Sequence, residues 1–275
     1  MRRRSWVNGL ATSVVMISIA CTVAFPFYYI IVNTFKTQQQ TSESPLGLPT
    51  SLSLTNYKNV WDNIPVLQSF ENTLRVTVLS VVFMLLLGSM AAYGIVMRKN
   101  RASRRIHIVL LLALAVPFQV TLIPIYQAFV KFHLVDSLNG LVLIYTGGAI
   151  FSYFLIQGYM QTIPLEIIEA ARIDGCGTVR MYWRIVIPLI RPVLVTVGIF
   201  QTIWVWNDFL APSVFIISPQ NYTLVLQAYQ SVGEYTTNWP AFMTLSVLSL
   251  IPITIFFLLM QRHIVSGLAA GAVKG

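Results

Sequence analysis

The residue types that perform chemistry in proteins are few in this chain and scattered along it. It has nine Asp and Glu, three His and two Cys among its 275 residues. His107, His133 and His263 show no metal-ligand spacing, and Cys21 and Cys176 lie far apart in the sequence. No GxGxxG or G-x(4)-G-K-[ST] phosphate-binding motif occurs, and no nucleophile–base pair stands out. We therefore expect no enzymatic activity, catalytic residue, metal site or bound cofactor in this chain.

The composition favours a membrane protein. Only 10% of the residues are charged and 56% are hydrophobic, whereas soluble domains carry about 25% charged residues. The net charge of +9 does not indicate nucleic-acid binding, because the basic residues are not interleaved with aromatic ones. We expect an all-α integral membrane protein that forms one transmembrane domain over residues 1–275 and binds no nucleic acid.

Six apolar stretches are long enough to cross a bilayer, which takes about 20 residues of helix. They are Gly9–Val32, Val76–Met97, Ile106–Tyr126, Leu138–Gln157, Val193–Leu210 and Phe242–Met260. Lys and Arg near the ends of spans face the cytoplasm. An N-terminus inside the cell leaves four of the 18 Lys and Arg on the outer side, namely Lys36, Lys58, Arg75 and Lys131. This asymmetry predicts a multi-pass cell-membrane protein with both termini in the cytoplasm.

The polar segment 162–188 separates the fourth and fifth stretches and has a pattern typical of a helix, a turn and a second helix. Gly175 can adopt the left-handed conformation that ends a helix. Thr178 fits the N-cap of a second helix over Val179–Ile185, and Pro188 is expected to break that helix before the next span. We predict a compact helix–turn–helix on the cytoplasmic face that docks on a partner.

The spacing in this segment resembles the EAA motif of ABC-importer permeases. Glu-Ala-Ala at 169–171 is followed by three residues and Gly175, then by nine residues and Ile-Val-Ile-Pro at 185–188, with Ile187 where the family usually has Leu. In that family the loop takes force from a separate ATPase. The resemblance implies an ATPase-coupling surface made of Glu169, Ala170, Ala171, Arg172, Asp174, Gly175, Ile185 and Pro188.

The resemblance covers nearly the whole chain. SLSLTNYKNVW at 51–61, the Pro-x-Gln at 117–119, Ile-Pro at 123–124, Trp-Asn-Asp at 206–208 and the tail from Gln261 to Gly275 are similar to the carbohydrate, maltose-type branch. It implies a permease that moves a sugar or oligosaccharide by alternating access. Its implied partners are a second permease subunit, two ATP-binding subunits that hold the ATP, an extracytoplasmic solute-binding protein and the lipid bilayer.

Three polar residues of the spans are candidates for the solute pathway, namely Gln119, Asn207 and Asp208. Ionisable residues at membrane depth are costly and often functional. Asp208 follows Pro188 by 20 residues, roughly 30 Å of helix, which places it near the outer interface. Interfacial capping of a helix, or packing against another subunit, is the more ordinary explanation of Asp208.

Two other classes of protein, and one other type of solute, stay open. A self-sufficient secondary transporter would show repeated halves and a charged midplane site, and neither is visible in this sequence. A membrane scaffold without transport activity would lack the EAA spacing. An ABC permease for a solute other than a sugar would share all these features.

Overall fold

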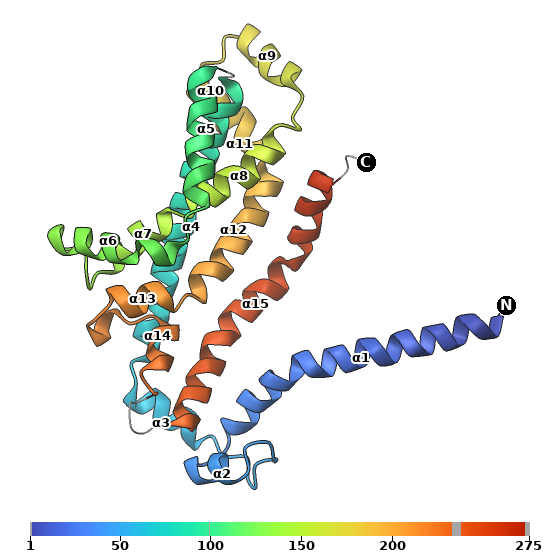
Figure 1. Cartoon of the computed structure of the whole chain (residues 1–275), viewed down its shortest axis with the longest axis vertical. Coiled ribbons are helices and arrows are strands. Elements are labelled where there is room, and N and C mark those ends of the chain that lie inside the picture. The colour runs from blue at the N-terminus through green and yellow to red at the C-terminus, as the bar shows by residue number, and fades with distance from the viewer. Residues whose placement is uncertain (1, 99, 233–237, 273–275) are drawn as a thin grey trace. The chain divides into compact units, whose positions relative to one another are not determined.

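The computed structural model describes residues 2–98, 100–232 and 238–272. This described part consists of helices and connecting loops and contains no β-strand, which confirms the all-α prediction. The chain forms two compact units (Figure 1). One comprises Met1–Gln68 with Leu224–Ile251, and the other comprises Ser69–Thr223 with Pro252–Gly275. The last three residues of the tail that resembles maltose-type permeases lie outside the described residues.

Within the described residues, four helical segments are long and apolar enough to span a bilayer: Thr12–Asn33, Val66–Met97, Leu138–Met160 and Trp239–His263. They belong to α1 (Arg2–Asn33), α4 (Val66–Met97), the pair α7 (Leu138–Thr146) and α8 (Ala149–Met160), and α15 (Trp239–Ala272). They agree with the first, second, fourth and sixth predicted spans. Each contains enough helix to satisfy its own backbone hydrogen bonds across hydrocarbon.

The third predicted span, Ile106–Tyr126, is wrong as a single straight helix. It is broken into α5 (Arg101–Leu114) and α6 (Phe118–Lys131), whose axes differ by 98° (Figure 1). Pro117 stands at the break and adopts an extended conformation as the N-cap of α6. A proline disfavours helical conformation in the residue before it and cannot donate a backbone hydrogen bond, so the chain turns there.

The fifth predicted span, Val193–Leu210, extends too far at its C-terminal end. Helix α12 covers Arg191–Trp206, and a separate short helix, α13, begins at Leu210. The axis of α12 is bent by 76° from the preceding helical stretch Thr178–Leu189. The described residues give the six predicted spans only when each of the two bent pairs, 101–131 and 178–206, is counted as one span.

The unit that contains the N-terminus also holds α2 (Gln38–Glu43), α3 (Thr55–Asn63) and α14 (Leu224–Tyr229). Its loop after α1 is organised around Lys36, which is only 2% exposed. The Lys36 ammonium donates to the carbonyl oxygens of Ser44 at 2.8 Å and Pro45 at 3.3 Å. Asn56 donates to the carbonyls of Thr34 and Lys36 at 2.7 and 2.8 Å. Burial lowers the pKa of Lys36, and the carbonyl oxygens compensate part of the lost hydration of its charge.

The second unit has two loops joined by Asp136, which precedes α7. The Asp136 carboxylate accepts from the backbone N–H groups of Ile217 and Ser218 at 3.0 and 2.9 Å, and from the Ser218 hydroxyl. Asn221, in the 3-10 helix η2 (Pro219–Asn221), donates to the Asp136 carbonyl at 2.8 Å. Burial raises the pKa of Asp136, but these hydrogen bonds outweigh it and lower the pKa to about 2. The ionised carboxylate therefore ties the loop after α6 to the loop after α13 (Leu210–Phe215).

The apolar core of the second unit lies where α4, α8, the 162–188 segment and α12 meet. It contains fourteen buried side chains, among them Tyr93, Ile156, Ile168, Val186 and Val197. Where α4 and α8 approach, a Cβ on Gly88 would lie 2.8 Å from the Ser152 Cβ and 2.9 Å from the Tyr153 backbone nitrogen. Small residues permit this close contact between helices. The contact holds α4 against α8, and the 162–188 segment that follows α8 shares the same apolar core as α4.

Candidate functional site

The first helix of the 162–188 segment is α9 (Leu165–Ile173), and it ends in a Schellman motif. Gly175 has a φ of 76°, as the sequence predicts. The Gly175 N–H donates to the Arg172 carbonyl and the Cys176 N–H donates to the Ala171 carbonyl, both at 3.0 Å. These two bonds satisfy carbonyls at the helix end. Gly175 therefore sets the direction in which the chain leaves α9.

The second helix of the segment differs from its prediction at both ends. Gly177, and not Thr178, is the N-cap of α10 (Thr178–Met181). A π-helical turn, η1 (Tyr182–Val186), follows, and α11 (Ile187–Leu189) continues it, so Pro188 does not end the helix. In the π turn the Ile187 N–H donates to the Tyr182 carbonyl. This wider turn reduces the conflict between a proline and the helical turn that precedes it.

The predicted coupling residues divide between two faces of the segment. Ala171 is buried and Ile185 is half-buried, and both contribute to the apolar core. The other six are exposed, namely Glu169, Ala170, Arg172, Asp174, Gly175 and Pro188. Five of these exposed residues lie between Glu169 and Gly175, on either side of the buried Ala171, and Pro188 lies apart from them in the sequence. Docking on a partner can therefore use the run from Glu169 to Gly175 directly, whereas Ala171 and Ile185 hold it in place.

The exposed face also carries large apolar side chains that the motif does not include. Ile173 is 85% exposed and Val179 is 72% exposed, and Trp183 and Ile167 are exposed as well. They lie around the Gly175 turn, on α9, α10 and η1. The sequence could have revealed them, because each is a large apolar residue within a segment that is otherwise largely polar. Large apolar groups rimmed by polar residues are typical of protein–protein contacts.

Two tyrosines attach the segment to α4. The Tyr182 hydroxyl lies 2.8 Å from the Ser89 hydroxyl in a buried contact, and the Tyr93 hydroxyl donates to the Thr178 carbonyl at 3.1 Å. The two rings pack with centroids 5.4 Å apart. In Figure 1 the segment lies at the end of this unit where α4 ends and α5 begins. Packed, hydrogen-bonded groups therefore join α10 and η1 to α4.

Asp208, a predicted solute-pathway residue, is held by groups on two helices. The Tyr145 hydroxyl donates to its carboxylate at 2.7 Å, and the backbone N–H groups of Leu210 and Ala211 donate at 3.2 and 3.1 Å. The Asp208 carboxylate thus accepts from N–H groups of the first turn of α13, whose N-cap residue is Phe209, and this favours the capping interpretation among the three that the sequence leaves open. Tyr145 is 2% exposed, and its ring meets the half-exposed Trp204 edge-to-face at 5.6 Å. The pathway role of Asp208 stays a prediction.

The other two predicted pathway residues are placed separately. Asn207 is exposed at the end of α12 and donates to the Ile203 carbonyl at 2.8 Å. Gln119 is exposed in the first turn of α6. Among the hydrogen bonds of the described residues none joins Gln119 to Asn207 or Asp208. The described residues also include no group of three His, Cys, Asp or Glu that could hold a metal ion, and the absence of metals and cofactors stays a prediction.

The helices and their exposed apolar surfaces define an all-helical membrane protein. A model of the family described as the binding-protein-dependent transport system inner membrane component matches residues 84–269, and this chain belongs to that family. The match confirms the family expected from the EAA spacing. It also supports a location in a membrane, and it identifies the chain as a transport component.

Individual relatives agree with this assignment. A probable permease for starch degradation products from Thermoanaerobacterium thermosulfurigenes is 38% identical over 90% of this chain and 91% of its own length. The melibiose/raffinose/stachyose import permease of Bacillus subtilis is 28% identical over 94% of both chains. A chain from the crystal structure of a bacterial ABC transporter that imports alginate has a TM-score of 0.82 at 21% identity, covering 94% of this chain and 97% of that one. The last likeness concerns the fold.

Proposed function

We propose that this chain is a permease subunit of an ABC importer and passes a sugar or oligosaccharide across the cell membrane by alternating access. The observation that carries the proposal is the combination of the EAA spacing with an exposed docking face around Gly175. The solute class rests on similarity to relatives whose names specify starch degradation products and melibiose, raffinose or stachyose. The partners are a second permease, two ATP-binding subunits and a solute-binding protein.

In this proposal the run from Glu169 to Gly175 and the exposed Ile173, Val179 and Trp183 enter a groove of the ATP-binding subunit. Their apolar surface supplies the contact, and Glu169 and Arg172 fix its register through charge. When ATP binds, the ATP-binding subunits close and displace α9 and α10. The Ser89–Tyr182 and Tyr93–Thr178 contacts carry that displacement into α4.

The orientation of the chain follows from the same proposal. Helices α9 and α10 must face the cytoplasm to meet an ATP-binding subunit, which also places both termini there. The distribution of Lys and Arg supports this orientation, because the basic residues gather at the chain ends, in residues 98–105 and in the 162–188 segment.

The test of the proposal is uptake by the complete transporter in vesicles. The chain is reconstituted with its second permease and ATP-binding subunits, and the solute-binding protein and ATP are added. We expect ATP-dependent uptake of a labelled oligosaccharide, and we expect this uptake to fall when unlabelled sugars are added as competitors. Uptake of an amino acid in preference to any sugar would assign a non-sugar ABC permease. Uptake by this chain alone, driven by a proton or sodium gradient, would replace the proposal with a secondary transporter.

A further inference from the structure

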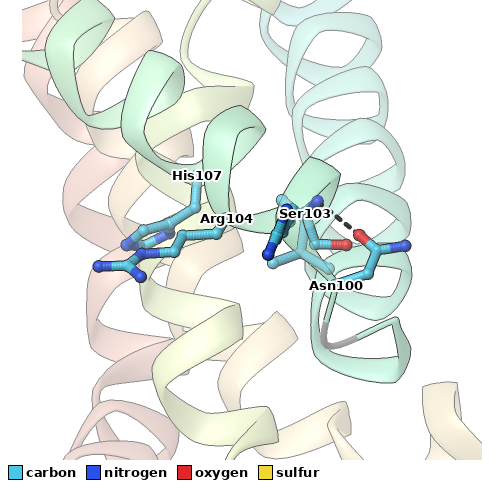
Figure 2. A pocket seen from close by; sticks show the side chains of 6 residues that line it. Asn100, Ser103, Arg104 and His107 are labelled. Carbon is cyan, nitrogen blue, oxygen red and sulfur yellow. Dashed lines mark hydrogen bonds between the residues drawn. The ribbon is translucent and has the colours of Figure 1, made fainter.

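A pocket of about 430 Å³ lies in the second unit, and its lining includes neither Asp208 nor any residue of the docking face. It is lined by Ile95 at the end of α4 and by the first two turns of α5, and Figure 2 shows its side chains. The α5 residues are Asn100, Arg101, Ser103, Arg104 and His107. No acidic residue is among them. The pocket is therefore a positively charged recess at the end of an apolar helix.

Local hydrogen bonds fix the geometry of this recess. Asn100 is the N-cap of α5, and its carbonyl oxygen accepts from the Ser103 N–H at 2.8 Å. The start of a helix of 14 residues contributes N–H groups and a positive dipole end. The His107 Nδ1 lies 2.7 Å from the Tyr153 hydroxyl of α8, which fixes the ring and leaves its Nε2 as the second polar atom. Arg104 and His107 are one helical turn apart and extend from the same side of α5 (Figure 2).

The surface next to the pocket is apolar and exposed. Ile106, Val109 and Leu112 follow the pocket along α5 at intervals of three residues, and each is more than half exposed. They belong to the first half of a bent pair that is apolar enough to span a bilayer. A ligand with an anionic head and hydrocarbon chains matches both surfaces at once. A free phosphate ion would use only the pocket.

We propose that this pocket binds the phosphate headgroup of an anionic phospholipid, whose acyl chains lie along the exposed face of α5. Arg101 and Arg104 supply the charge, and His107 closes one side. The Ser103 hydroxyl and those first-turn N–H groups of α5 that Asn100 does not cap supply donors. Basic pockets between transmembrane helices bind anionic headgroups in this way. The site does not involve the ATPase-docking face, and it requires only that the chain spans a membrane.

The experiment compares two double variants of the complete, purified transporter. Arg101→Gln with Arg104→Gln removes two charges that line the pocket. Arg98→Gln with Arg105→Gln removes two exposed charges of the same region that do not line it. Retention of phosphatidylglycerol and of phosphatidylcholine is measured by native mass spectrometry after delipidation and titration. Thermal stability of each complex checks that the variants fold.

We expect phosphatidylglycerol to bind more tightly than phosphatidylcholine, and the pocket variant to lose this preference. One basic residue near the surface contributes about fivefold to the affinity for anionic lipid, so two contribute about 30-fold. The control variant should lose clearly less of the preference, because its two charges do not line the pocket. Equal losses in both variants, or equal binding of the two lipids, would overturn the proposal. Inorganic phosphate gives a second test. If it displaces no lipid but raises the thermal stability of the wild type more than that of the pocket variant, the pocket is a free-anion site and the proposal is overturned.

Discussion

The left-handed conformation of Gly175 gives a sharp test of the docking face. We consider Gly175→Val beside the matched control Gly177→Val, two residues away. Both glycines are exposed, and a Cβ at either position would meet nothing within 4 Å. They differ in backbone conformation, because Gly175 has a φ of 76° and Gly177 has a φ of −66°. Any effect that is specific to position 175 therefore reports conformation and not steric overlap with neighbours.

The expected magnitude follows from the cost of the left-handed region. A residue with a Cβ pays roughly 1–2 kcal/mol there, and a β-branched one is a genuine outlier. Unwinding the turn avoids this cost but loses the two Schellman hydrogen bonds, each of which contributes about 1 kcal/mol. Only the native turn presents Ile173 and Val179 correctly, and a strain of about 1–2 kcal/mol against the roughly 2 kcal/mol lost on unwinding leaves between about half and five-sixths of the molecules in that turn, so the apparent affinity for the ATP-binding subunit should fall by up to about twofold.

The assay is solute-stimulated ATP hydrolysis, and co-purification of the ATP-binding subunits, in the reconstituted complex. We expect Gly175→Val to reduce both while its abundance in the membrane stays normal, because the buried core of the unit is untouched. Gly175→Asn should restore part of the activity, since Asn tolerates the left-handed region better than other residues. The reasoning is refuted if Gly175→Val and Gly177→Val both couple as the wild type does, or if they lose coupling equally.

Three further predictions concern other contacts. Tyr182→Phe should lower the stability of the complex by about 1 kcal/mol, and Ser89→Ala by at least as much because Ser89 also donates to the Leu85 carbonyl. The double variant should lose less than the sum, because both changes remove the Ser89–Tyr182 hydrogen bond; a double-mutant cycle of thermal unfolding measures this, and full additivity contradicts it. The Asp136 pKa of about 2 lies below its unfolded value, so its contribution of at most about 2 kcal/mol is complete above pH 4 and is lost as the pH falls toward 2. Unfolding of the solubilised protein between pH 5 and pH 2.5 should therefore depend less on pH in Asp136→Asn, and an unchanged slope would show that the two loops do not need this carboxylate. With the native cysteines replaced, Ser44→Cys should react with an impermeant thiol reagent outside intact cells and Ala102→Cys should not; both side chains are exposed, and the reverse pattern would invert the orientation.

The features that the sequence predicts well are those fixed by local backbone physics. A positive φ is tolerated by glycine above all, so the end of α9 at Gly175 is visible in the sequence. Hydrocarbon requires every backbone group to be paired within a helix, so the apolar stretches in α1, α4 and α15 are visible as well. Both kinds of signal depend on neighbouring residues alone.

The features that the sequence misses depend on distant contacts. Three prolines have different outcomes, because Pro117 starts a helix at a break, Pro124 lies inside α6, and Pro188 lies in the first turn of α11. What decides between these outcomes is whether the preceding turn can rearrange against its neighbours. The contact between Tyr145 and Asp208 joins residues 63 positions apart, and no periodicity marks it.

The π-helical turn Tyr182–Val186 makes the number of residues between α10 and α12 part of the mechanism. A π turn holds one residue more than an α turn of the same rise, and each residue in an α-helix rotates the chain by about 100°. Deleting one residue from this turn would convert it to an α turn, and would rotate α10 by about that angle relative to α11. Val179 would then leave the docking face even though every side chain of the EAA motif remained. Docking thus requires both the residue types of the EAA motif and the number of residues in the π-helical turn, and engineered chimaeras of this segment must keep both.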